Sequence, residues 1–95
     1  MNCKTIKYSG HAVRQMFERR LSNIEVEAVV RLGETVAEYA DDKPYPSRLL
    51  LGYSAARPVH VLVAHEAATE SCIIVTAYEP DIELWLEDFK TRRKK

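Results

Sequence analysis

The hydrophobic pattern of the chain changes its period at Gly33, and this change constrains the fold more than any other feature. Before Gly33 the apolar side chains recur at helical spacing, and after it they alternate with polar ones as in half-buried strands. Ser22 and Glu25 form a capping box, which predicts a helix over 23–32 that ends before Gly33. Helices followed by strands predict an α+β domain.

A second capping signal lies at Ser9 and predicts an earlier helix over 10–20. Each predicted helix carries an apolar stripe that we expect to face the core. Val13, Met16 and Phe17 form the stripe of the first helix, with Arg20 on the same side, and Ile24, Ala28, Val29 and Leu32 form that of the second.

Four strand-like segments follow the helices and are separated by short, turn-rich stretches. They cover 35–39, 48–53, 59–64 and 71–78. Short connections favour an antiparallel meander. Asp81 can cap a short last helix that contains Trp85 and Phe89. The sequence therefore predicts two N-terminal helices packed on one face of a mainly antiparallel four-stranded sheet, with a short C-terminal helix.

The charges of the chain balance, with 14 Lys and Arg against 14 Asp and Glu. Proteins that bind nucleic acid usually carry a basic excess, so any contact with RNA or DNA would need a local patch. A length of 95 residues fits one domain over 1–95. Its basic end, 90–95, is expected to be a frayed tail.

Two features of the sequence lead us to expect a cytoplasmic protein. No apolar run is long enough to span a membrane, and the first ten residues lack the apolar core of a signal peptide. Cys3 and Cys72 are far apart in the chain, and in a reducing cytosol we expect free thiols.

Signatures for metals, cofactors and phosphate loops are absent from the sequence. The three His and two Cys do not fall at the spacing of zinc ligands, and no Gly-rich phosphate loop or nucleophile elbow occurs. We therefore expect no metal and no cofactor. His, Arg, Lys and Tyr remain for acid–base chemistry, a set that fits RNA cleavage by the 2′-hydroxyl.

The polar face of the first predicted helix is open to two interpretations. It gathers His11, Arg14, Gln15, Glu18 and Arg19. A plain amphipathic helix would present the same side chains to solvent. A His at a helix start is less expected, because the dipole there disfavours the imidazolium, and a neutral imidazole suits proton transfer. The face is either solvated or one wall of a site, with His11, Arg14 and Arg19 as catalytic candidates.

Further candidates come from the predicted sheet and its loops. His60 lies in the middle of a strand and Tyr78 at the end of another, where they serve either as packing residues or as acid–base groups. Lys43 and Tyr45 lie in a loop stiffened by two prolines, and Arg48 follows it. We expect these three to contact substrate, the alternative being an ordinary polar turn.

Five segments of the chain together resemble a widespread bacterial and archaeal family of small domains. They are SGHAVRQMFERRLS (9–22), EVEAVV (25–30), DDKPYPSRLLLGY (41–53), RPVHVLVA (57–64) and IIVTAYEPD (73–81). The pattern is a Ser-x-His-Ala start, an Arg three residues after the His, a Glu-Arg pair and a Thr-x-Tyr-x-Pro end. The likeness spans roughly residues 5–82.

The resemblance implies a fold similar to the RelE/ParE-like toxins and, more broadly, to metal-independent ribonucleases of the barnase–RelE class. Members are often encoded beside a zinc-finger antitoxin of the MqsA/YgiT type. The resemblance therefore implies a toxin of a type II toxin–antitoxin system that cleaves mRNA, on the ribosome or free. The implied site has His11, Arg14 and Arg19 on the helix, with His60 and Tyr78 on the sheet.

Two other interpretations of function remain open at this point. Zero net charge favours a non-catalytic protein-binding module on the same fold, including a gyrase-targeting, ParE-like toxin. A small hydrolase acting on another substrate rests only on the same polar cluster. Edge strands could also pair two copies into a homodimer or accept an antitoxin segment.

Overall fold

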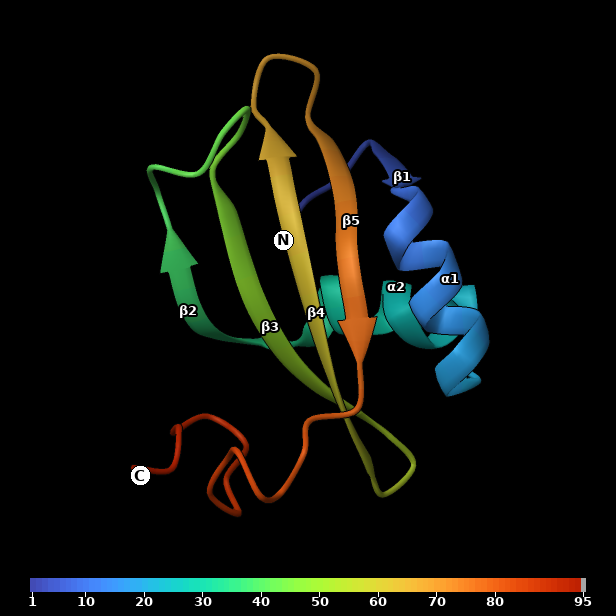
Figure 1. Ribbon diagram of the computed structural model, residues 1–95. Coiled ribbons are helices and arrows are strands. Elements are labelled where there is room, and N and C mark those ends of the chain that lie inside the picture. Colours follow the sequence, from blue (N-terminus) through green and yellow to red (C-terminus); the bar gives the residue numbers. More distant parts are fainter. Residues whose placement is uncertain (95) are drawn as a thin grey trace.

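The computed structural model describes residues 1–94 of the chain as an α+β domain. Its elements are β1 (Thr5–Tyr8), α1 (Gly10–Arg19), α2 (Asn23–Leu32), β2 (Glu34–Tyr39), β3 (Ser47–Ser54), β4 (Arg57–Glu66) and β5 (Ser71–Tyr78). The strands form one sheet in the order β1-β5-β4-β3-β2 (Figure 1). Helix α2 packs behind β3 and β4, and α1 packs beside β5.

The sheet has five strands and is mixed, so the prediction of a four-stranded antiparallel sheet is wrong. β2 to β5 form the expected antiparallel meander, but β1 adds a parallel partner to β5, with Ile6 opposite Cys72. β1 has only four residues, which leaves little periodicity to detect. Its partner lies more than sixty residues further along the chain, and local turn signals cannot reveal such a pairing.

The two helices begin where the capping signals predict. The Ser9 side chain accepts a hydrogen bond from the amide of Ala12, and the Ser22–Glu25 capping box is complete. Helix α1 ends at Arg19 and is capped by Arg20, which adopts a left-handed conformation with φ 56° and donates its backbone N–H to carbonyl oxygens of the last turn.

The prediction of which helix residues are buried is right for Met16 and Val29 and wrong for Val13, Phe17, Ile24 and Leu32. Helix α1 buries Ala12 and Met16, while Phe17 is 86% exposed. Helix α2 buries Val26, Val29 and Val30, while Ile24 and Leu32 are exposed. A close contact sets the rotation of α2, because a Cβ at Gly52 of β3 would lie 2.7 Å from a methyl of Val29. Only a glycine lets the helix approach the sheet this closely.

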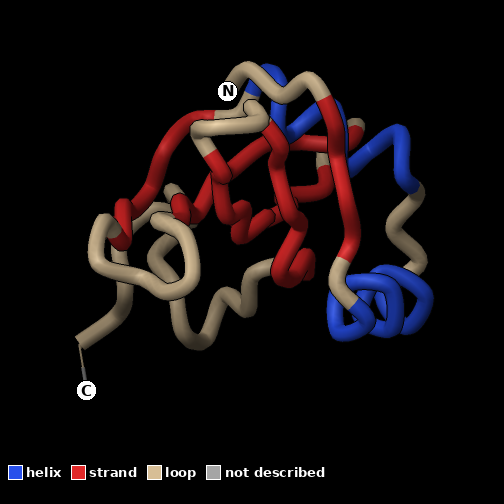
Figure 2. The backbone as a smooth tube through the Cα atoms, turned by 90° about the horizontal axis from the view of Figure 1, so that it is seen from above, coloured by secondary structure: helices blue, strands red, loops and turns tan. Residues whose placement is uncertain are grey.

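The predicted C-terminal helix is wrong. The chain turns at Asp81 and then folds back on itself, with an isolated bridge between Trp85 and Arg92. The Asp88 carboxylate accepts hydrogen bonds from the amides of Lys90 and Thr91, and this local bonding competes with helix formation. Residues 79–94 form an irregular C-terminal segment, which lies beyond the end of β5 at the lower left of Figure 1 and on the opposite side from α2 in Figure 2.

Cys3 and Cys72 form a disulfide, so the prediction of free thiols is wrong. The bond joins the segment before β1 to the start of β5, next to the parallel strand pair. Sequence spacing could not reveal it, because the non-local β1–β5 pairing brings the two residues together.

Within residues 1–94, none of the helices has the length and apolar character needed to cross a membrane.

The sheet presents different side chains on its two faces. On β4, Val59, Val61 and Val63 are fully buried against the helices. Because side chains alternate along a strand, His60 and Leu62 point to the opposite face. The C-terminal segment covers part of that opposite face, and the candidate site lies there.

Candidate functional site

His60 and Tyr78 lie side by side on the sheet face that is not covered by helices. They are direct cross-strand partners on β4 and β5, because the antiparallel register pairs them. Nδ1 of His60 lies 3.2 Å from the hydroxyl oxygen of Tyr78. Of the residues predicted from the sequence for catalysis, these two make direct contact.

The second ring nitrogen of His60 fixes the tautomer. Nε2 lies 2.7 Å from the backbone carbonyl oxygen of Phe89. A carbonyl oxygen only accepts hydrogen bonds, so Nε2 carries the proton and donates. In the neutral ring Nδ1 is then an acceptor, and the Tyr78 hydroxyl donates to it. The result is a chain of two hydrogen bonds from Tyr78 through His60 to Phe89.

Phe89 holds an uncommon backbone conformation to make this contact. Its φ is 55°, in the left-handed region that a bulky residue rarely adopts. Such a conformation costs on the order of 1 kcal/mol and persists only where surrounding contacts impose it. At Phe89 these contacts are the hydrogen bond to His60 and the backbone hydrogen bonds of the turn that ends at Thr91.

Burial sets the protonation states of the pair. His60 is fully buried, and the edge-on ring of Trp85 lies 4.7 Å from its imidazole, centroid to centroid. Burial lowers the pKa of His60, although the Phe89 carbonyl opposes this shift. Burial also raises the pKa of Tyr78, and the nearby Tyr39 adds to the rise while Arg92 opposes it. At neutral pH the pair is therefore a neutral imidazole beside a neutral phenol.

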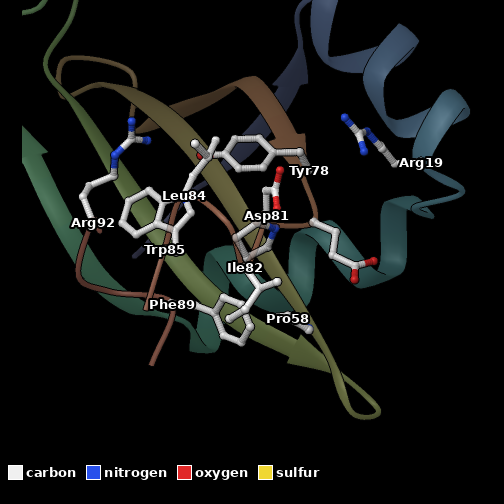
Figure 3. A pocket seen from close by; sticks show the side chains of 11 residues that line it. Arg19, Pro58, Tyr78, Asp81, Ile82, Leu84, Trp85, Phe89 and Arg92 are labelled. Atoms are coloured by element: carbon white, nitrogen blue, oxygen red, sulfur yellow. The ribbon is translucent and has the colours of Figure 1, made fainter. Parts of the chain in front are cut away.

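A cavity of about 720 Å³ opens beside Tyr78, between α1 and the C-terminal segment (Figure 3). Arg19 of α1 stands on one side of it, and Trp85 and Arg92 stand on the other. The guanidinium of Arg92 lies over the Trp85 ring, 5.2 Å from its centroid. The cavity is also lined by Glu79, which pairs with Arg57, and by Asp81. The cations on its two sides suit an anionic ligand, and the phenol oxygen between them, whose proton is donated to His60, can accept a hydrogen bond.

Arg57 fixes the position of Arg19 relative to the sheet. From the start of β4 it pairs with Glu79 at 2.8 Å and donates to the carbonyl oxygens of Arg19 and Arg20. These bonds tie the end of α1 to the end of β5. The sequence pattern indicates no role for Arg57, because its partners are all distant in the chain.

His11 and Arg14 stay apart from this cavity. Both are exposed on α1, and neither is among the described residues that line the cavity. Of the three catalytic candidates on α1, only Arg19 lines the cavity beside Tyr78.

The three predicted substrate contacts lie at the other end of the sheet. Lys43 is exposed in the loop between β2 and β3, and Tyr45 hydrogen-bonds to Glu66. Arg48 pairs with Glu38 at 3.3 Å. Arg48 lies two residues before the buried Leu50 on β3, so both side chains are on the face of the sheet that the helices cover.

Three residues of the site were not recognised as site residues from the sequence. The sequence pattern predicts a short C-terminal helix that contains Trp85 and Phe89, and a frayed tail that contains Arg92. A usable signal was the presence of two aromatic side chains in a mainly polar C-terminal stretch, which indicates packing against the domain. Within residues 1–94, no cluster of three or more potential ligands could hold a metal ion.

The fold and the site define a small α+β domain with a histidine–tyrosine pair under a polar cavity. Residues 8–79 match the family described as a domain of unknown function, DUF4258, and the chain belongs to this family. The match includes Arg19, His60 and Tyr78, whereas Trp85 and Phe89 lie beyond it. Comparisons with curated proteins and with solved structures gave no match.

Proposed function

We propose that the protein is a metal-independent endoribonuclease that cleaves RNA at its 2′-hydroxyl. The observation that carries the proposal is the hydrogen-bonded chain from Tyr78 through His60 to Phe89, which ends beside a cavity flanked by Arg19 and Arg92. A nucleophile, a base and a group that orients the base form the usual arrangement for activating a hydroxyl. Here Tyr78 relays the proton between the substrate and the base.

The relay explains how a buried histidine can act on a substrate it does not touch. The Tyr78 oxygen takes the proton of the 2′-hydroxyl as its own proton passes to Nδ1 of His60. The 2′-oxygen attacks the adjacent phosphorus, and the bond to the 5′-oxygen breaks. That oxygen takes a proton from water in the open cavity, which leaves a 2′,3′-cyclic phosphate and a 5′-hydroxyl. His60 then returns its proton through Tyr78 to solvent.

The two arginines supply charge stabilisation. Phosphoryl transfer places extra negative charge on the non-bridging oxygens, and fixed cations beside them lower the barrier. Arg19 is positioned by the bonds that Arg57 makes to its backbone, and Arg92 by its stacking on Trp85. A local pair of cations also accommodates an RNA strand on a chain whose formal net charge is zero.

We further propose that the protein is the toxin of a type II toxin–antitoxin pair, with mRNA as its substrate and a zinc-finger antitoxin as its partner. The support is the resemblance of its motifs to a family with a RelE/ParE-like fold. This role implies the cytoplasm, where thiols are normally reduced. The Cys3–Cys72 disulfide therefore sets a condition, namely that the domain stays folded when the bond is reduced.

The test is RNA integrity with purified protein. One reaction uses naked RNA with EDTA, and a second uses a translating extract, which needs its Mg²⁺. The proposal predicts cleavage that survives EDTA or that appears only during translation, with cyclic phosphate ends. An oligonucleotide with 2′-O-methyl groups throughout should stay intact, because it has no 2′-hydroxyl. Intact RNA in both reactions would overturn the proposal.

One observation favours a second candidate, a non-catalytic binding module. His60 is fully buried and both of its ring nitrogens are hydrogen-bonded, as in a histidine that serves only packing. The groove would then bind a partner without turnover. A gyrase-targeting version predicts DNA damage without loss of mRNA, which distinguishes it from the ribonuclease.

A further inference from the structure

A second, smaller hollow adjoins Tyr78 on the same sheet face. It has a volume of about 270 Å³ and is lined by Tyr39, Asp42, Leu49, Leu62, Thr76 and Tyr78. We infer that this hollow is a subsite for one unstacked nucleobase of an RNA strand, with a preference for guanine. The inference rests on the proposed function for the identity of the ligand and extends it to base recognition.

The floor of the hollow is a row of side chains across three strands. Leu49 of β3 pairs with Leu62 of β4, which in turn pairs with Thr76 of β5. Adjacent cross-strand side chains on one face form a continuous surface. This surface is apolar apart from one hydroxyl, and it suits the face of a base.

Two tyrosines border this floor. Tyr39 at the end of β2 is 44% exposed, and Tyr78 separates the hollow from the larger cavity. Aromatic side chains on an open sheet bind single-stranded nucleic acid by stacking on its bases. Solvent-accessible tyrosine at the rim therefore favours a flat aromatic ligand over an aliphatic one.

Asp42 supplies the polar selectivity. Its Oδ2 accepts a hydrogen bond from the Ser47 hydroxyl at 2.6 Å, and Ser47 is itself buried at the start of β3. The carboxylate is thus held at the rim of the hollow with lone pairs left over. A carboxylate accepts but does not donate when ionised. It favours a base edge with adjacent N–H donors, as guanine has, and disfavours uracil, whose single N–H lies between carbonyls.

Positively charged side chains lie near the hollow, where they can contact the phosphate backbone of a bound strand. A third cavity, of about 340 Å³, shares Tyr39, Leu49 and Tyr78 with the hollow and also includes Lys90 and Arg92. The larger cavity shares Tyr78 and Arg92 with it. The three cavities therefore adjoin one another at Tyr78, so the phosphate of a base in the hollow can lie near Arg92 and near Lys90, which pairs with Glu34.

The experiment measures binding and not cleavage, so that it is independent of catalysis. Short 2′-O-methyl oligonucleotides that differ only in one central base, guanine or uracil, are titrated with the full chain by fluorescence anisotropy. We expect guanine to bind at least about tenfold more tightly, and Asp42→Asn to abolish that difference while uracil binding changes little. Asp41→Asn, a neighbouring carboxylate outside the hollow, should leave the preference intact.

A second variant covers the case in which Asp42→Asn perturbs the loop. Ser47→Ala frees the carboxylate without removing its charge and should reduce the guanine preference only in part. Equal affinity for both bases in the parent protein, or no binding of either, would overturn the subsite. Base-selective binding without any cleavage would instead refute the proposed ribonuclease and leave the subsite standing.

Discussion

The imidazole of His60 accepts a hydrogen bond from the Tyr78 hydroxyl at 3.2 Å and donates one to the carbonyl of Phe89 at 2.7 Å. The sheet register places the first two residues opposite each other, and the C-terminal segment supplies the third. The strands alone would leave His60 open to solvent on one face. The segment excludes water from the imidazole and fixes its tautomer, which makes Nδ1 the group that can take a proton from Tyr78.

RNA cleavage should show a broad pH plateau. His60 must be neutral, with Nδ1 free of a proton, to accept the proton, and burial lowers its pKa below the ordinary value of 6.5. Tyr78 must be protonated to relay it, and its pKa is raised above 10.0. The rate should therefore be flat from about pH 7 to 9 and fall with acid only below pH 6.5. A rate that rises steadily between pH 7 and 9 would contradict the relay.

Trp85→Ala should expose His60 and shift its titration. The substitution removes the ring that lies against the imidazole, so less desolvation opposes the charged form and the pKa of His60 should rise toward 6.5. Loss of a buried tryptophan should also destabilise the fold by about 3 kcal/mol. NMR titration of the histidine C–H signals measures the first effect. His65, a partly exposed histidine away from the site, is the internal control. An unchanged His60 titration would show that Trp85 does not set its environment.

Reduction of the Cys3–Cys72 bond should lower stability without unfolding the domain. The bond spans 69 positions, and closing a loop of that length is worth about 4 kcal/mol in the chain-entropy model. Urea unfolding with and without a reductant measures the difference, and Cys3→Ser should match the reduced parent protein. If the reduced domain is unfolded in the absence of urea, a reducing cytoplasm is ruled out as its working environment.

The turn between β3 and β4 allows a matched test of backbone conformation. Ala55 has a φ of 56°, where an alanine is strained and a glycine is not. Ala55→Gly should stabilise the domain by about 1 kcal/mol. Ala56 lacks this strain, so Ala56→Gly should destabilise the domain or leave it unchanged. Thermal unfolding of the two variants compares them directly, and a reversed order would contradict the turn geometry.

The parts of the fold that the sequence predicts are those encoded locally. The Ser22–Glu25 capping box and the short turns of the meander involve residues close in the chain, and each appears as expected. The sequence does not predict β1 or the disulfide, because both depend on contacts between residues far apart in the chain. The prediction of a C-terminal helix was wrong because the Asp88 carboxylate accepts hydrogen bonds from nearby backbone amides. The spacing of apolar residues does not indicate this competition.

Only the part of the candidate site that lies on the strands could be predicted from the sequence. A strand-centred His60 and a strand-ending Tyr78 could be named from alternation, although their pairing required the register. Arg19 could not be separated from His11 and Arg14, because helical periodicity gives a face and not its distance to a sheet. Phe89 enters through its backbone carbonyl, which no side-chain pattern reports.

The most direct test of the account is the rate of RNA cleavage by Tyr78→Phe. The variant keeps the ring and removes only the hydroxyl that would relay the proton. Tyr45→Phe, which removes a hydroxyl bonded to Glu66 at the far end of the sheet, is the matched control. Unfolding curves should confirm that both variants are folded. We predict a loss of about 100-fold or more for Tyr78→Phe and little change for Tyr45→Phe. Equal cleavage by the folded Tyr78→Phe variant and the parent protein would contradict the proton relay at the centre of this account.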